Sequence, residues 1–246
     1  MNKTIILATG FLLIFGAAVR AQAPAEIRLG AGYGSYSMGD LEALQENSMQ
    51  GIGVNIKATE RFPAYFNYSL RYLFKSKVDD HFGVVAEMGS TGGRIGYADY
   101  SGSYREDQLL RYRRIGVVVE SYRALPKGFD GWLGCEASLL FSKLIYEGEI
   151  SLTGAGSTSE HYTFYALGGA VQPYLALERK IGFIRLGAQA GVCLSLSEGF
   201  SLKEDRNIKL VNPGKSSEEV VPGWSGWRLS MYVGVPLSAG SGRKEN

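Results

Sequence analysis

The sequence is poor in the residues from which most catalytic and metal sites are built. Only two histidines and two cysteines occur in 246 residues, and they are scattered along the chain. A structural zinc site needs four such ligands at short spacings, which these positions do not offer. Gly-x-Ser-x-Gly, His-Glu-x-x-His and phosphate-loop motifs are absent from the sequence as well. We therefore expect a protein that is not an enzyme and that holds no metal and no cofactor.

An excess of positive charge is also missing. Lys and Arg number 26 against 24 Asp and Glu, so the formal net charge is +2. Nucleic-acid binding relies on clustered positive charge, so we expect no nucleic-acid partner. Proline is scarce, at 7 residues, and no Pro-rich or Ser-rich linker divides the chain. The sequence predicts one domain over residues 22–246.

The first 21 residues have the layout of a secretory signal peptide. Lys3 precedes an apolar stretch at 5–19, and the small residue Ala21 ends the segment. The apolar stretch is shorter than the roughly 20 residues of a transmembrane helix. We predict cleavage after Ala21, which removes Lys3 and Arg20 and leaves a neutral chain (24 − 24 = 0). No cysteine lies near the cut to accept a lipid.

Glycine and tyrosine are abundant, and apolar residues alternate with small or polar ones along most of the chain. Glycine accounts for 33 residues, and tyrosine, at 15, exceeds phenylalanine, at 11. The clearest alternation runs over 184–197 and 227–235. Segments of about ten residues with this period are typical of strands in an outer-membrane barrel, whose apolar set faces lipid. The predicted fold class is therefore all-β, an antiparallel transmembrane β-barrel.

Ten strands are favoured, with eight as the alternative. The candidates are 26–36, 51–59, 64–75, 81–90, 94–104, 109–123, 131–152, 163–178, 182–197 and 224–237. Short connectors at 60–63, 91–93, 124–130 and 179–181 are assigned to the periplasmic side, and long ones at 37–50 and 198–223 to the outside. The segment 94–104 is the weak member, because its polar residues also suit an ordered loop. A helix is expected in the first outer loop, where Asp40 precedes Leu41 and Leu44 on one face.

The rival fold is a soluble antiparallel barrel or sandwich, which shows the same alternation with the apolar face inward. Three features favour the membrane. The non-apolar face is rich in small residues, most charge runs lie in the outer loops, and aromatic residues stand near strand ends as membrane girdles do. The aromatic set comprises Tyr33, Tyr36, Phe62, Tyr65, Phe74, Tyr122, Phe129, Trp132, Trp224 and Trp227.

Several short stretches also resemble a known family. They are the Tyr/Gly-rich first strand, Ser37 to Leu41, Phe62 to Phe66, Ser90 to Arg94 and Asp99 to Gly102. Together they resemble outer-membrane β-barrel proteins of Bacteroidetes over roughly the whole mature chain. The resemblance implies a barrel fold and an outer-membrane location, and it carries over no catalytic residue.

The polar face of the predicted strands places charges of both signs inside the barrel. A barrel of eight to ten strands is narrow enough for side chains to fill it, so we expect a structural ion-pair network that closes the lumen. The alternative is a polar channel or ligand pocket lined by the same residues. The predicted set comprises Arg28, Lys57, Arg71, Glu87, Arg114, Glu120, Glu136, Glu178, Arg185 and Arg228.

The remaining reactive residues point to no chemistry. His161 follows Ser159 and Glu160, but neighbours on a strand point in opposite directions, so Glu160 cannot readily orient His161. His81 is interpreted as a rim residue. The loop acids Glu204, Asp205, Glu218 and Glu219 are interpreted as solvated charge. Cys135 and Cys193 fall on opposite faces of the sheet and are expected to be free thiols.

These observations predict a monomeric barrel in the outer membrane, inserted by the barrel-assembly machinery and in contact with membrane lipid and lipopolysaccharide. Its expected role is structural, surface-interacting or slow passage of small solutes. The alternatives are a surface enzyme acting on lipid A or peptides, a small selective pore, and a soluble periplasmic barrel that binds an apolar ligand.

Overall fold

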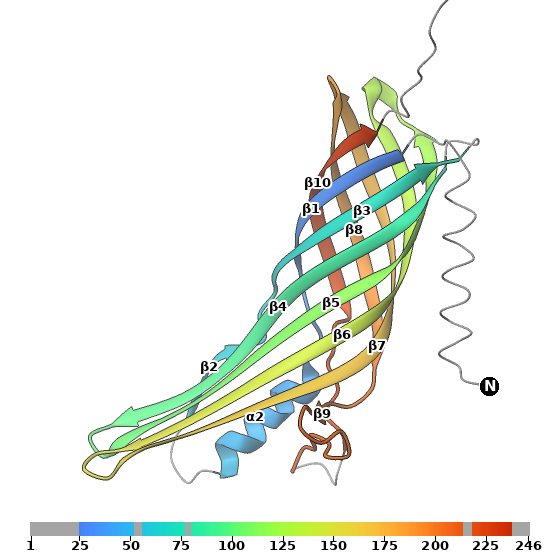
Figure 1. Cartoon of the computed structure of the whole chain (residues 1–246). Coiled ribbons are helices and arrows are strands. Elements are labelled where there is room, and N and C mark those ends of the chain that lie inside the picture. The colour runs from blue at the N-terminus through green and yellow to red at the C-terminus, as the bar shows by residue number, and fades with distance from the viewer. Residues whose placement is uncertain (1–24, 52–55, 77–79, 214–217, 238–246) are drawn as a thin grey trace, which may run out of the picture.

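Eight antiparallel strands close into a barrel in the computed structural model, which describes residues 25–51, 56–76, 80–213 and 218–237 (Figure 1). The ring runs in the order β1, β3, β4, β5, β6, β7, β8 and β10, and β10 pairs back with β1. Its strands are β1 (Ala25–Gly34), β3 (Tyr65–Lys75), β4 (His81–Asp99), β5 (Gly102–Ala124), β6 (Asp130–Leu152), β7 (Gly156–Ile181), β8 (Ile184–Ser197) and β10 (Gly226–Leu237).

Two short strands lie outside the ring and bring the total to the predicted ten, whereas the ring itself has the eight strands of the predicted alternative. β2 (Lys57–Arg61) pairs with β4, and β9 (Ser201–Leu202) pairs with β7. A helix, α2 (Gly39–Gly51), follows β1 where a helix was expected, and a 3-10 turn, η1 (Pro126–Gly128), connects β5 to β6. The predicted signal peptide, residues 1–21, lies outside the described residues.

The two ends of the barrel differ. Ala25 and Leu237 pair at what we call the near end, where the connections 76–80, 125–129 and 182–183 are short. The far end carries the long connections 35–64 and 198–225, together with the turns 100–101 and 153–155. Strands β4 to β7 continue past the ring at this end and form a curved sheet beside α2 (Figure 1). We call 92–99, 102–109, 145–152 and 156–163 the far-end extension.

The extension corrects two predicted boundaries. Residues 91–93 are not a turn: they lie inside β4, which pairs with β5 without interruption from His81 to Asp99. The segment 94–104 therefore contributes the end of β4 and the start of β5 rather than a strand of its own. Ile95 still faces inward and is buried, but residues 97–104 at the tip are exposed or partly exposed on both faces of the sheet, which ends the alternation that marks the other strands. The connector 60–63, which was predicted on the periplasmic side, lies at the far end. The short connector at the near end is 76–80 instead.

The outward face of the ring is apolar. Leu29, Leu70, Leu175, Leu194 and Met231 point away from the barrel and are each at least 48% exposed. Tyr33, Phe66 and Trp227 form one aromatic group on this face. The ring centroids of Phe66, which is edge-on to Tyr33, and of Trp227, which is tilted, lie 5.4 and 5.9 Å from that of Tyr33. Among the described residues, no helix is long and apolar enough to cross a membrane.

Five aromatic residues of the predicted girdle are instead inside. Tyr36 and Tyr122 are partly buried and pack against the two inner apolar clusters. Phe62, Trp132 and Trp224 are 3%, 4% and 1% exposed. Trp132 occupies an inward position of β6, and the other two belong to the far-end loops that fold back over the barrel mouth. The cysteines are free, as predicted, with Cys135 outward and exposed and Cys193 inward and buried.

Candidate functional site

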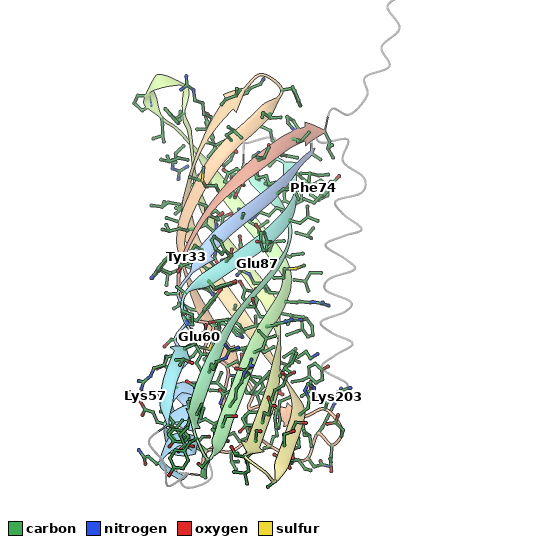
Figure 2. The ribbon with its side chains drawn as sticks, turned by 90° about the vertical axis from the view of Figure 1, so that its left-hand side faces the viewer. Tyr33, Lys57, Glu60, Phe74, Glu87 and Lys203 are labelled. Atoms are coloured by element: carbon green, nitrogen blue, oxygen red, sulfur yellow. The ribbon has the colours of Figure 1, made fainter. Side chains whose placement is uncertain are left out.

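The predicted charged residues come together inside the ring, with one exception. Arg28, Arg71, Glu87, Arg114, Glu120, Glu136, Glu178 and Arg228 are all at most 7% exposed, and the side chain of Arg185 is 23% exposed. Lys57 does not join them. It lies on β2 outside the ring, its side chain is exposed, and Figure 2 shows it far from Glu87. The helix preceding β2 carries the chain past the barrel mouth before the next strand begins, so strand parity does not place Lys57 in the lumen.

The near half of the lumen is organised around Arg28. Its Nη1 donates to both carboxylate oxygens of Glu120 at 2.8 Å, and its Nε donates to Glu26 at 2.5 Å. Its Nη2 lies 3.1 Å from Glu178. The ring of Trp132 lies 5.6 Å from the guanidinium carbon. One arginine therefore joins strands β1, β5 and β7 across the interior.

A second centre joins Arg71, Arg114 and Glu136 in the far half of the ring. Arg71 donates to one oxygen of Glu136, and Arg114 donates to the other at 2.9 Å. Arg114 also donates to Glu87 and, at 2.9 Å, to the amide oxygen of Gln172. Arg71 lies 3.8 Å from Glu120, so the two centres are continuous.

Three inward tyrosines repeat one arrangement in this network. Tyr112, Tyr174 and Tyr232 each lie over a glycine on the neighbouring strand, and a Cβ built on Gly89, Gly134 or Gly187 comes within 2.5 Å of the respective ring. Each hydroxyl donates to a glutamate: Tyr112 to Glu87 at 2.6 Å, Tyr174 to Glu120 at 2.7 Å and Tyr232 to Glu178 at 3.2 Å. The abundance of glycine and tyrosine thus has a packing cause at these positions, because a ring fills the space that the glycine leaves.

The charges of the ion-pair network balance. Its five arginines (Arg28, Arg71, Arg114, Arg185 and Arg228) and five glutamates (Glu26, Glu87, Glu120, Glu136 and Glu178) sum to zero. Glu106 is also buried but lies outside this network, where it accepts hydrogen bonds from Tyr104 at 2.8 Å and Gln108 at 2.7 Å. Ions removed from water persist when each is paired and hydrogen-bonded, and removing one partner leaves a costly lone charge. The network holds the strands in register and fills the space that water would otherwise occupy.

An apolar plug closes the far mouth of the barrel. Met38, Leu41 and Leu44, on α2 and its entry, pack with Phe200, Val220 and Trp224 from the connection 198–225, and all are at most 6% exposed. Trp224 donates from Nε1 to Ser142 at 2.8 Å. Arg228 fixes this connection by donating to the backbone carbonyls of Trp224 at 2.8 Å and Ser35 at 2.5 Å.

Sequence reasoning missed two members of the network, Glu26 and His81. Glu26 is two residues from Arg28 on the same strand face, so the parity rule reaches it. His81 is not a rim residue: it is 3% exposed, its Nδ1 lies 3.2 Å from Glu120, and its ring stacks on Trp132 with centroids 4.1 Å apart. Strand parity reaches His81 as well, because it shares one face of β4 with Glu87, which was predicted to lie in the lumen.

His161 lies in the far-end extension, where the structure gives it a different carboxylate from the one beside it in sequence. Its Nδ1 is 3.3 Å from Glu147 on β6, and both side chains are more than half exposed. Ser159 and His161 share the outward face of β7. Within the described residues, no hydrogen bond joins their side chains. Among the residues that the structure describes, no three His, Cys, Asp or Glu side chains gather as a metal site.

Asp107 anchors the charges on the outward face of the extension. Burial raises the pKa of its carboxyl group, but hydrogen bonds from Arg94 and Arg105 outweigh this effect and hold the pKa below its usual range. The carboxylate is therefore ionised at neutral pH and is already occupied by two arginines.

Two solved structures are similar to this chain. Neisserial surface protein A matches with 12% identity and a TM-score of 0.36, over 86% of this chain and 96% of its own. Ail, the attachment invasion locus protein of Yersinia pestis, solved in complex with the heparin analogue sucrose octasulfate, matches with 12% identity and a TM-score of 0.33, over 88% and 100%. No protein-family model matches the chain, and no curated protein matches its sequence. At these identities and TM-scores, neither neighbour's binding properties extend to this chain.

Proposed function

We propose that the chain spans the outer membrane of a Gram-negative bacterium as a closed barrel that conducts no solute and presents its far end to the exterior as an interaction surface. The Bacteroidetes origin rests only on the sequence resemblance described above. The proposal includes cleavage of the signal peptide after Ala21, insertion by the barrel-assembly machinery and a monomeric state.

The lengths of the strands support a membrane position. A strand tilted by about 45° crosses a bilayer in roughly 9–11 residues. Strands β1, β3, β10 and β8 have 10, 11, 12 and 14 residues. Strands β5, β6 and β7 have 23, 23 and 26 residues, so about half of each is left to project from the membrane. The ring also leaves no open strand edge, as a lipid environment requires.

The closure of the lumen is the observation that carries the function. Charged side chains that are at most 7% exposed fill the middle, and the apolar plug covers the far mouth. Two barriers in series leave the far-end extension and the connections 35–64 and 198–225 as the surfaces that a partner can reach. Their charged outward face favours adhesion or another surface interaction over passage of solute.

Planar-bilayer conductance of the purified barrel tests this function. We expect no open-channel steps, and we expect a band that shifts on heating in electrophoresis, which shows that the barrel is folded. Discrete conductance from a heat-modifiable protein would favour the small selective pore instead. Release of the protein into the periplasmic fraction without a heat shift would favour the soluble barrel.

A surface enzyme is the alternative that His161 keeps open. The contact with Glu147 supplies one element of a Ser/His/Glu group, and Ser159 lies on the same face. We propose that it is not used in catalysis, because the pair is exposed and lies on the extension rather than at the ring. H161A cells should therefore show an unchanged lipid A profile. A lipid A species that accumulates in these cells would establish an enzyme.

A further inference from the structure

Three cations gather on the outward face where the extension joins the ring. Arg111 of β5 stands directly opposite Lys143 of β6, and Arg113 follows two residues along β5 on the same face. The side chains of Arg111 and Arg113 are exposed, and that of Lys143 is partly exposed. We call these three residues the basic triad.

The basic triad has no anionic partner. The side chains of its members form no hydrogen bond and no ion pair within the part of the chain that the structure describes. The next outward residue along β5 that carries a carboxylate is Asp107, which Arg94 and Arg105 already occupy. The positions around the triad on the same face are Ser90, Leu109, Phe141, Ile145 and Tyr165. Each of them is neutral. Arg111 lines a surface pocket together with Asp107 and Glu147, but neither carboxylate forms an ion pair with it.

Such an arrangement is unfavourable unless an anion is bound. Like charges directly opposite on neighbouring strands repel each other. Inside the same ring every arginine is met by a carboxylate or by backbone carbonyls, so the unpartnered triad differs from the interior of the ring. Two guanidinium groups and an ammonium group side by side suit phosphate, which accepts charge-assisted hydrogen bonds from several donors.

The level of the triad on the barrel indicates where that phosphate comes from. The cross-strand row Met88, Arg113, Phe141 and Leu167 is otherwise apolar. The next row toward the far end is Ser90, Arg111, Lys143 and Tyr165, which is polar or amphipathic throughout. The change from apolar to polar marks a membrane–water interface, where arginine and lysine stems lie along lipid and their heads reach the head groups.

We propose that the basic triad binds the phosphate of an outer-leaflet lipid head group, that of diphosphorylated lipid A. This inference rests on the proposed membrane position of the barrel. Arg111 and Lys143 hold the phosphate between β5 and β6, and Arg113 reaches up to it from the lipid-facing row. The bound phosphate offsets most of the positive charge of the triad and fixes the height of the barrel in the membrane.

The test is native mass spectrometry of the detergent-solubilised barrel with diphosphoryl lipid A, with the same lipid after removal of its phosphates, and with inorganic phosphate. The variant R111Q/R113Q/K143Q should raise the dissociation constant for diphosphoryl lipid A by about tenfold or more. The near-end control R123Q/R179Q removes exposed cations from the other end of the barrel and should leave the dissociation constant unchanged. The variant R111K/R113K/K143R preserves charge and should retain most of the binding.

Equal retention of diphosphoryl lipid A by the wild type and by R111Q/R113Q/K143Q would overturn the proposal, as would equal binding of the dephosphorylated lipid. Binding of inorganic phosphate as tightly as lipid A would make this a solute site and would also overturn it. Every variant must show heat-modifiable mobility, which shows that it is folded. If the triple variant does not fold, the single variant K143Q replaces it in the binding measurement. A wild-type chain that shows no heat shift fails the membrane proposal itself, whereas a folded wild type that binds no lipid A fails only this inference.

Discussion

Tyr232 and Gly187 illustrate how closely the lumen is packed at the scale of single residues. A Cβ on Gly187 would lie 2.1 Å from Cζ of Tyr232, whose hydroxyl donates to Glu178. G187A must displace the ring and weaken that hydrogen bond, and we expect a loss of about 1–3 kcal/mol in the free energy of unfolding. Urea unfolding followed by tryptophan fluorescence measures it. G169A is the control, because its nearest atom would be 3.7 Å away, and an equal loss in both would contradict the account.

Glu120 is the most connected carboxylate of the network. It accepts from Arg28 and Tyr174 and lies beside Arg71 and His81. E120Q leaves the surrounding arginines short of one negative charge, and we expect a loss of about 3–5 kcal/mol in the free energy of unfolding. E149Q, at an exposed position of the same sheet, should change it by less than about 0.5 kcal/mol. Similar stabilities for both variants would mean that the network contributes little.

Asp99 makes the stability of the turn at the tip of the extension depend on pH. Its carboxylate accepts from the hydroxyl of Ser101 at 2.6 Å, from the hydroxyl of Tyr97 at 2.7 Å and from the backbone amide of Ser101 at 2.8 Å. These hydrogen bonds lower the pKa of Asp99 from 3.8 to about 2. A depressed folded-state pKa means that the stabilisation is complete above pH 3.8 and disappears as the pH falls through about 2.

Amide exchange at Ser101 reports this turn. After correction for the intrinsic rate, protection should be constant from neutral pH to about 4 and should fall as the pH approaches 2. D99N should show the reduced protection at every pH, because an amide offers a weaker, uncharged acceptor. Constant protection down to pH 2 in the wild type would show that the carboxylate does not hold the turn.

Most of the charged lumen follows from strand parity, because consecutive inward positions of a barrel strand share one face. Parity fails for Lys57, where a helix and a second short strand interrupt the ring. Strand parity does not show which side chains form ion pairs, because Arg28 reaches Glu120 and Glu178 on strands that are far from β1 in sequence.

At the scale of elements, we expect the plug and the ion-pair network to act as two successive barriers. Trp224 is 1% exposed and contacts Tyr36 and Tyr112, with ring centroids 5.0 and 4.4 Å away. W224A should destabilise the plug by about 3–5 kcal/mol while the charged centres below it stay in place. We therefore expect W224A to remain silent in planar bilayers. Conductance from W224A would show that the plug alone closes the barrel.

The helix and most strands of the ring were predictable, because their local signals agree with the tertiary structure. The far-end extension was not. Arg94, Tyr97 and Asp99 resemble loop residues because the tip of this sheet is exposed or partly exposed on both faces, and sequence alternation marks only a strand that has one apolar face. The plug also has no local signal, since its members come from α2 and from a connection some 160 residues later in the chain.

At the scale of the whole molecule, we propose a membrane-spanning ring with its short near end in the periplasm and its long far end outside the cell. Single cysteines in a C135S/C193S background test this arrangement. Tyr100 at the tip of the extension is 94% exposed, and Phe183 in the near-end turn is 78% exposed. Both positions accept a cysteine without disturbing a buried contact.

The decisive measurement is labelling of Y100C and F183C on intact cells with a membrane-impermeant maleimide. The account predicts that Y100C is labelled on intact cells and that F183C is labelled only after the outer membrane is permeabilised. Labelling of F183C on intact cells, or of neither position before permeabilisation, would contradict a barrel that spans the outer membrane with its far end exposed.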